Sequence, residues 1–348
     1  MRKSVWSIAA AGLALLVVSC STNRAGDPES ITLIAHDSFA EAVTEETFRA
    51  FTDDTGIEVD VIAGGDAGAM VTQAVLTSGN PIADVIFGVD DTFLSRALEG
   101  GIFAEHQSTL IDSVPSSLQL GPSNLVTPIS FGDVCLNYDK AWFENTQIRV
   151  PTRLDDLRAG LYAEHLAVEH PATSSPGLAF MLATIVEFGE EGWLDFWQDL
   201  KEHGVRVAPD WNTAYYADFT RYGGDSSIVV SYASSPPAEV IFADEPLDEA
   251  PTGVIESGCY RQTEFAGVLE GTEHAVAAGK LVDFMLSVEF QRTIPLNWFV
   301  FPANADADLP PEFVEFTLIP DSPAQLDPSL IAANRETWIQ QWVALMEG

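Results

Sequence analysis

The spacing of apolar residues predicts alternating strands and helices over the first third of the chain. Three β-rich apolar runs each end in polar residues, at 31–37, 57–65 and 83–91. Helical spacing of apolar positions follows each run, at 39–56, 66–79 and 92–101. Such an alternation is typical of a mainly parallel sheet that is covered by helices.

The same pattern continues towards the C-terminus. Three further segments each contain an apolar run, a loop of Ser, Asn, Trp or Tyr, and a helical stretch: 166–189, 204–224 and 226–243. Residues 252–272 look extended, and helices are expected at 273–287, 288–294 and 328–347. In sheets of this class, ligands collect where strand C-terminal ends meet helix N-termini. The loops after the apolar runs are therefore the places to look for a binding site.

The N-terminal segment is predicted to be a signal peptide, residues 1–19. Two basic residues precede the apolar stretch 8–18, which is too short to span a bilayer comfortably as a mature helix. The stretch ends just before Cys20 in a pattern that resembles a bacterial lipobox, so Cys20 would be lipidated. Residues 20–30 would then tether the domain to the extracytoplasmic face of the cell membrane. An ordinary signal peptide with an incidental Cys is the alternative.

The charge is extreme, with 52 acidic residues against 16 basic ones and a formal net charge of −36. This excludes nucleic acid as a partner, because its phosphates would be repelled. The field would attract cations, although at physiological salt it fades beyond roughly 8 Å. Adaptation of a secreted protein to salt or pH accounts for the charge at least as well. Outside the leader, Cys135 and Cys259 favour a disulfide, with two buried free thiols as the alternative.

Several blocks of the sequence resemble the thiamine-binding proteins of bacterial ABC importers. They are HDSF, ADVIFGVDDTFLSRALEGGIF, FGDVCLNYDKAWF, ATSSPGLAFML, WNTAYYADF, VVSYASSPPAEV and VDFMLS…FQRTIPLNWFVFP, between residue 31 and the C-terminus. The resemblance implies an α/β fold of the type II periplasmic binding protein class, in which two lobes joined by two crossover hinge strands close on a ligand.

By the same resemblance, lobe 1 would comprise 28–130 and 262–348, and lobe 2 would comprise 131–261. The crossover strands would be 130–139 and 258–267. Each contains one cysteine, so a Cys135–Cys259 bridge would fasten the hinge strands together.

The ligand implied is thiamine or one of its phosphates. A fixed thiazolium cation calls for aromatic faces, and the candidates are Trp211, Tyr215, Tyr232 and Trp298. Donors for the hydroxyethyl or phosphate end are expected from Ser174, Ser175, Gly177 and Ser235. Groups for the pyrimidine are expected from His36, Asp37, Ser38, Asp66 and Asp90. Taken singly, each ring could instead be core, and each serine or aspartate a helix cap.

The chain departs from the family at His36, where the family carries Tyr. The resemblance implies no catalysis, no cofactor and no metal, with ABC permease subunits as partners, a lipid anchor and a monomeric state. A rival on the same fold is a ferric-ion site of Tyr215, Tyr216 and His36, because phenolates and imidazole suit a hard trivalent metal. An enzyme is disfavoured, since the chain has no GxSxG and no HExxH motif.

Overall fold

The computed structural model describes residues 28–243, 245 and 247–348. The predicted signal peptide and the lipidation site Cys20 lie outside these residues. Within the described part of the chain, no helix combines the length and the hydrophobicity that crossing a bilayer requires.

A single sheet runs through the molecule in the order β2-β1-β3-β8-β4-β7-β5-β6, with β9 paired to β4. Its strands are β1 (Ser30–Ala35), β2 (Glu58–Ala63), β3 (Val85–Asp90), β4 (Thr127–Asp139), β5 (Leu166–Glu169), β6 (Arg206–Ala208), β7 (Ile228–Tyr232), β8 (Thr252–Val268) and β9 (Phe301–Pro302). The predicted apolar runs at 31–37, 57–65 and 83–91 form β1, β2 and β3, and the extended stretch at 252–272 forms β8. These strand predictions are confirmed.

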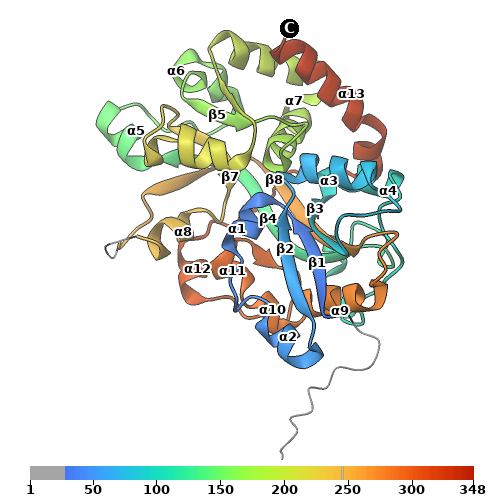
Figure 1. The fold of residues 1–348 in the computed structure, drawn as a ribbon. Coiled ribbons are helices and arrows are strands. Elements are labelled where there is room, and N and C mark those ends of the chain that lie inside the picture. The colour runs from blue at the N-terminus through green and yellow to red at the C-terminus, as the bar shows by residue number, and fades with distance from the viewer. Residues whose placement is uncertain (1–27, 244, 246) are drawn as a thin grey trace, which may run out of the picture.

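The helices surround this sheet (Figure 1). The α-helices are α1 (Asp37–Ala42), α2 (Arg49–Thr55), α3 (Ala67–Leu76), α4 (Asp91–Glu99), α5 (Lys140–Thr146), α6 (Gly160–Ala163), α7 (Ser175–Glu202), α8 (Pro236–Ile241), α9 (Ala275–Met285), α10 (Val288–Gln291), α11 (Ile294–Asn297), α12 (Pro311–Phe316) and α13 (Pro328–Met346). Short 3₁₀ turns are η1 (Ile111–Ser113), η2 (Ser116–Leu118), η3 (Leu154–Arg158) and η5 (Thr220–Tyr222), and η4 (Thr213–Asp218) is a π-helical turn.

The expectation of a mainly parallel sheet is wrong for the middle of the molecule. β1 is parallel to β2 and β3, and β5 is parallel to β6 and β7. Between these two groups lie the long strands β4 and β8, which are antiparallel to each other. β4 is also antiparallel to β7, and β8 is antiparallel to β3. β4 and β8 therefore connect the two parallel groups, which are the cores of the two lobes (Figure 1). The spacing of apolar residues predicts the alternation of helices and strands within each lobe, but it does not predict the direction of the strands that join the lobes.

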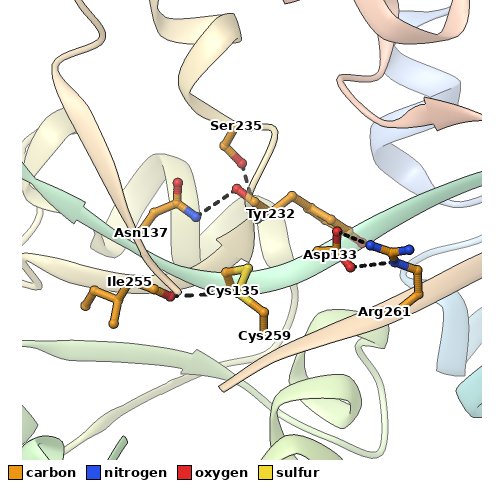
Figure 2. Close-up of a disulfide and its surroundings, with 8 residues drawn as sticks. All are labelled: Asp133, Cys135, Asn137, Tyr232, Ser235, Ile255, Cys259 and Arg261. Atoms are coloured by element: carbon orange, nitrogen blue, oxygen red, sulfur yellow. Dashed lines mark hydrogen bonds and ion pairs between the residues drawn. A yellow bond between two sulfur atoms is a disulfide. The ribbon is translucent and has the colours of Figure 1, made fainter. Parts of the chain in front are cut away.

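Besides their antiparallel pairing, the connecting strands are joined by a disulfide and an ion pair that lie close together (Figure 2). Cys135 on β4 and Cys259 on β8 form the predicted disulfide. Beside it, Asp133 on β4 accepts two hydrogen bonds from Arg261 on β8, at 2.7 and 2.9 Å. The proposed lobe boundaries, between residues 130 and 131 and between 261 and 262, both fall within these paired strands.

The predicted helix at 39–56 is wrong as one element, because the chain forms α1 and α2 with a turn between them. Val43 leaves the helical region, with φ −65° and ψ 134°, and the backbone N–H of Thr44 donates to Thr47 Oγ1 at 3.0 Å. A local hydroxyl that offers the backbone another partner competes with the helix. Phe39 and Phe51 remain buried, so the apolar face is kept.

The C-terminal helices differ from expectation in two places, one of which is α12, a helix that was not predicted. α9 and α13 match the predictions at 273–287 and 328–347, but the stretch 288–294 splits between α10 and α11. Ser287 caps α10, and Trp298 caps the C-terminal end of α11. α13 packs on α7 as well as on α4, so it contacts both lobes (Figure 1).

Candidate ligand-binding site

The predicted aromatic residues meet in one cleft of about 490 Å³. Trp211 lies just before η4 and Tyr215 within it, Tyr232 ends β7, and Trp298 caps α11. All four line the cleft. Three of them come from loops or strand ends of the segment 131–261 and one from the C-terminal segment, so side chains far apart in sequence face a shared space. The four rings therefore do not pack in separate hydrophobic cores away from a common cleft.

One side of the cleft, here called the Trp298 wall, consists of His36, Phe39, Phe87, Glu264 and Trp298. The indole of Trp298 stacks on Phe39 at 4.5 Å between ring centroids and on Phe290 at 5.7 Å. Its Nε1–H donates to the carbonyl oxygen of Phe39 at 3.4 Å. Phe39 in turn packs edge-on against Phe87 at 4.8 Å. Because Phe39, Phe87 and Phe290 are buried, Trp298 is an extension of the hydrophobic core that reaches the cleft.

The facing side, here called the Trp211 wall, consists of Trp211, Tyr215, Tyr216, Arg221, Tyr222 and Glu239. Trp211 stacks on Tyr215, with ring centroids 5.0 Å apart and planes 16° apart. The Nε1–H of Trp211 donates to Ser231 Oγ at 3.0 Å. Tyr216 and Tyr222 are half exposed and pack edge-on at 5.0 Å. On this wall the aromatic rings pack against one another, and the indole N–H of Trp211 is held by a hydrogen bond.

The hydroxyls of the Trp211 wall converge on a buried carboxylate. Tyr215 and Tyr222 donate to Glu239 Oε1 at 2.8 and 2.9 Å, and Arg221 Nε donates to Oε2 at 3.1 Å. The side chain of Glu239 is 2% exposed, against 37% for Arg221. Burial and the charge of Glu239 raise the pKa of the Tyr215 phenol well above its ordinary value.

The Trp298 wall contains a His–Glu pair. Nε2 of His36 lies 3.4 Å from Glu264 Oε1, while Nδ1 accepts from the backbone N–H of Phe39 at 3.2 Å. Burial alone would lower the pKa of His36, but the hydrogen bond and charge of Glu264, with Asp66 and Asp37 adding to them, raise it. Burial would raise the pKa of Glu264, yet His36 and Ser130 lower it. The pair therefore places a buried, ionised carboxylate at the cleft.

Asp66 lines the cleft at the N-cap of α3. Its carboxylate accepts from the backbone N–H of Ala67 at 2.9 Å and from that of Trp211 at 3.4 Å. Burial raises the pKa of Asp66, although the hydroxyl of Ser174 and these backbone donors act in the opposite direction. This aspartate caps a helix and also connects to the Trp211 wall, while its contact with the pyrimidine of a ligand stays a prediction.

Besides Asp37, three of the predicted site residues do not line the cleft: Asp90, Ser174 and Gly177. Asp90 is fully buried and caps α4, accepting from Thr92 and from the hydroxyl of Ser175. A Cβ on Gly177 would lie 2.5 Å from the carbonyl oxygen of Glu169, so this glycine serves close packing of α7 on β5. Asp90 therefore acts as a helix cap and Gly177 as a packing residue, while Ser174 is fully buried at the N-cap position of α7 without a capping bond from its side chain.

The other predicted serines surround the rings. Ser175 lines the cleft, although its hydroxyl donates to Asp90. Ser235 also lines it, hydrogen-bonds Ser231 at 2.9 Å and accepts from the backbone N–H of Tyr232 at 3.2 Å (Figure 2). The phenol of Tyr232 donates to Gln262 at 2.8 Å. Ser235 thus orients Tyr232 and, through Ser231, Trp211.

Ser38 and Asp37 lie at the edge of the site. Ser38 lines the cleft and also a smaller adjoining pocket of about 220 Å³. Asp37 lines only the smaller pocket and accepts from the backbone N–H of Gly65 at 2.8 Å.

Residues beside the two walls touch across the cleft. Asn212 donates to Glu41 at 3.2 Å, and Phe242 packs edge-on against Phe299 at 5.5 Å. With the hydrogen bond from the Trp211 backbone N–H to Asp66, these interactions join the two sides of the cleft.

Among the cleft residues that sequence reasoning missed are Phe39, Glu41, Arg221, Glu239 and Glu264. The signal for one of them was present, because Glu239 is the single acid within an otherwise apolar stretch, AEVIFA. A charge that must be buried on an apolar face needs a partner, and such a residue often marks a site.

The Tyr215, Tyr216 and His36 set of the ferric alternative is divided between the walls. His36 is paired with Glu264, and the hydroxyl of Tyr215 is bound by Glu239. A raised phenol pKa opposes the phenolate that a ferric ion requires. Within the part of the chain that the structure describes, no group of three or more His, Cys, Asp or Glu side chains is arranged to hold a metal ion.

Two α/β lobes, two connecting strands and a cleft between aromatic walls define an extracytoplasmic binding protein of the type II periplasmic class. The chain belongs to the bacterial extracellular solute-binding protein family, which matches residues 80–316. Members of this family bind solutes and are not enzymes.

The relatives agree with this assignment. The thiamine-binding periplasmic protein of Escherichia coli (strain K12) is 28% identical over 318 residues, which cover 90% of this chain and 92% of that protein. A solved periplasmic thiamin binding protein has a TM-score of 0.80 at 25% identity, covering 93% of this chain and 98% of the other. Iron-bound HitA from Pseudomonas aeruginosa has a TM-score of 0.72 at 21% identity, over 90% and 99% of the two chains, and shows the shared fold.

Proposed function

We propose that this protein captures thiamine or its phosphates outside the cytoplasm and delivers the vitamin to the permease subunits of an ABC importer. The observation that carries the proposal is the convergence of Trp211, Tyr215, Tyr232 and Trp298 on one cleft that also contains the ionised Glu264. Aromatic faces and a buried carboxylate suit a flat heterocycle with a fixed positive charge. The names of the relatives support the same ligand.

The energetics require all parts of the site. A desolvated cation over a ring gains on the order of 0.5–2 kcal/mol, so two or three rings supply only a few kcal/mol. Submicromolar affinity requires roughly −8 kcal/mol or better. The carboxylate of Glu264 adds a negative charge, and Asp66 and Ser38 add hydrogen-bonding groups at the cleft. We expect the remainder to come from burial of the pyrimidine.

Further features of the proposal come from the sequence. Cys20 would carry the lipid that holds the protein at the outer face of the membrane. The protein would act as a monomer, without a cofactor, and release its ligand chemically unchanged.

Isothermal titration of the purified, ligand-free protein tests the function. Thiamine should bind at submicromolar concentration and quench Trp fluorescence, because Trp211 and Trp298 line the cleft. The neutral hydroxymethyl aminopyrimidine half of thiamine should bind far more weakly. Absence of thiamine binding, together with a visible charge-transfer colour on addition of Fe(III), would favour the metal alternative instead.

A further inference from the structure

The Trp211 wall contains a ready-made anion site that is already occupied by the protein. Arg221 supplies a guanidinium, and Tyr215 and Tyr222 supply hydroxyls, all within 3.1 Å of a Glu239 carboxylate oxygen. A guanidinium and two hydroxyls that converge on one point are the donors that would hold a phosphate group. The carboxylate of Glu239 accepts hydrogen bonds from all three groups and neutralises the charge of the arginine.

The second place where a phosphate could bind is also compromised. At the start of α7, the hydroxyl of Ser175 donates to Asp90, and Ser174 is fully buried and does not line the cleft. Of these two serine hydroxyls predicted to receive the hydroxyethyl or phosphate end, one is therefore engaged by a carboxyl group of the protein and the other lies outside the cleft.

The remaining groups of the cleft repel phosphate. Glu41, Asp66, Glu239 and Glu264 line it, against the cationic Arg221 and the histidine His36. Both of the latter are paired, His36 with Glu264 and Arg221 with Glu239. A phosphate ester would have to displace one of these carboxylates or enter beside it, and either step costs electrostatic free energy.

We propose that Glu239 is a specificity-determining residue, and that the cleft selects unphosphorylated thiamine over its phosphate esters because Glu239 fills the subsite formed by the Arg221 guanidinium and the two tyrosine hydroxyls. The inference rests on the proposed function and names the form of the ligand that the site takes. Its opposite, uptake of the phosphates through Arg221, is the outcome against which it is tested.

Isothermal titration with thiamine, thiamine monophosphate and inorganic phosphate provides the test. For the unaltered protein, we expect thiamine to bind at least tenfold more tightly than the monophosphate. Glu239→Gln removes the carboxylate charge with little change in volume, so the ratio of monophosphate to thiamine affinity should rise at least tenfold. The double variant E239Q/R221Q should lose this gain, since the gain depends on the freed guanidinium.

Asp199→Asn is the matched control. Asp199 accepts from Arg158 Nε at 2.6 Å, and neither residue lines the cleft. Loss of this ion pair should leave the affinity ratio unchanged. Circular dichroism melting shows whether each variant folds. If E239Q does not fold, the ratio of monophosphate to thiamine affinity in the unaltered protein still tests the proposal.

The outcomes separate the two proposals. If the protein binds none of the vitamin forms, the proposed function fails. If thiamine and its monophosphate bind equally well, or if E239Q leaves their ratio unchanged, the function stands and the role of Glu239 is overturned. Binding of inorganic phosphate alone to the unaltered protein would also overturn it.

Discussion

The Trp298 wall and the Trp211 wall face the same cleft but hold their rings in different ways. Trp298 stacks on buried phenyl rings and continues the core of its lobe. On the Trp211 wall, the phenols of Tyr215 and Tyr222 are fixed by hydrogen bonds to Glu239, and the indole of Trp211 by one to Ser231. The first arrangement ties the binding surface to the stability of the fold. The second sets the orientation and charge of the surface, and we expect it to decide what binds.

Replacing each Trp by Ala should show this difference most strongly. Trp211→Ala should weaken thiamine binding about a hundredfold, because it removes a ring that stacks on Tyr215 at the cleft. Trp298→Ala should weaken binding only about tenfold, since two phenyl rings already stack on its indole, but should cost roughly 2–3 kcal/mol of unfolding free energy. Titration calorimetry and urea unfolding measure the two quantities.

Trp142→Ala serves as the control for these variants. Trp142 is partly buried on α5, packs against Phe143 at 4.9 Å and does not line the cleft. Its loss should lower stability without changing affinity. Equal effects of W211A and W298A on both quantities would remove the distinction between the walls.

The pH dependence of binding examines the charge on the Trp298 wall. Because Glu264 raises the pKa of His36, the imidazolium persists above the ordinary range of histidine. Its positive charge opposes a cationic ligand, so affinity for thiamine should increase as pH rises through the raised pKa of His36. Below that pKa the affinity should reach a low plateau, and above it a high plateau. We expect a change of about fivefold between the two plateaus.

The His36→Gln variant should show a flat profile over the same range. Titration calorimetry from pH 5.5 to 9, with heats corrected for buffer ionisation, measures both proteins. A profile that is unchanged by H36Q would assign the titration to another group.

The smallest effect is expected from the contact that joins the walls. Asn212→Ala removes the hydrogen bond from Asn212 to Glu41 at 3.2 Å. Because this bond is exposed, its loss should reduce thiamine affinity only about twofold. Gln198→Ala is the control, since it removes an exposed hydrogen bond to Glu202 at 2.8 Å outside the cleft. A tenfold loss in N212A, measured by calorimetry, would show that closure depends on this contact.

Much of the fold could be predicted because it follows from local patterns. The apolar runs that form β1, β2 and β3 have strand character in their own residues, and α9 and α13 show their helical period directly. The break between α1 and α2 could not be read from apolar spacing, because Phe39 and Phe51 still share a buried face while Thr44 and Thr47 interrupt the helix.

The candidate site was predictable in its rings and less so in its polar groups. Trp211, Tyr215, Tyr232 and Trp298 were identified by the family resemblance and by their place in loops after apolar runs, and all reach the cleft. Asp90 follows a strand in the same way, yet it is buried as a helix cap. A side chain's position after a strand does not say whether it points to the cleft or back to its own helix.

The sequence by itself determined the alternation of strands and helices, the pairing of the two cysteines and the aromatic character of the binding surface. These are properties of residue type and spacing, which act over a few positions or constrain the whole chain through one covalent bond. The tertiary structure alone decided the antiparallel centre of the sheet, the pairing of His36 with Glu264 and the convergence of three donors on Glu239. The His36–Glu264 pair joins residues more than two hundred positions apart, and even the nearer donors to Glu239 depend on how η4, η5 and α8 pack. Buried charges find such partners only once the elements that carry them have folded together.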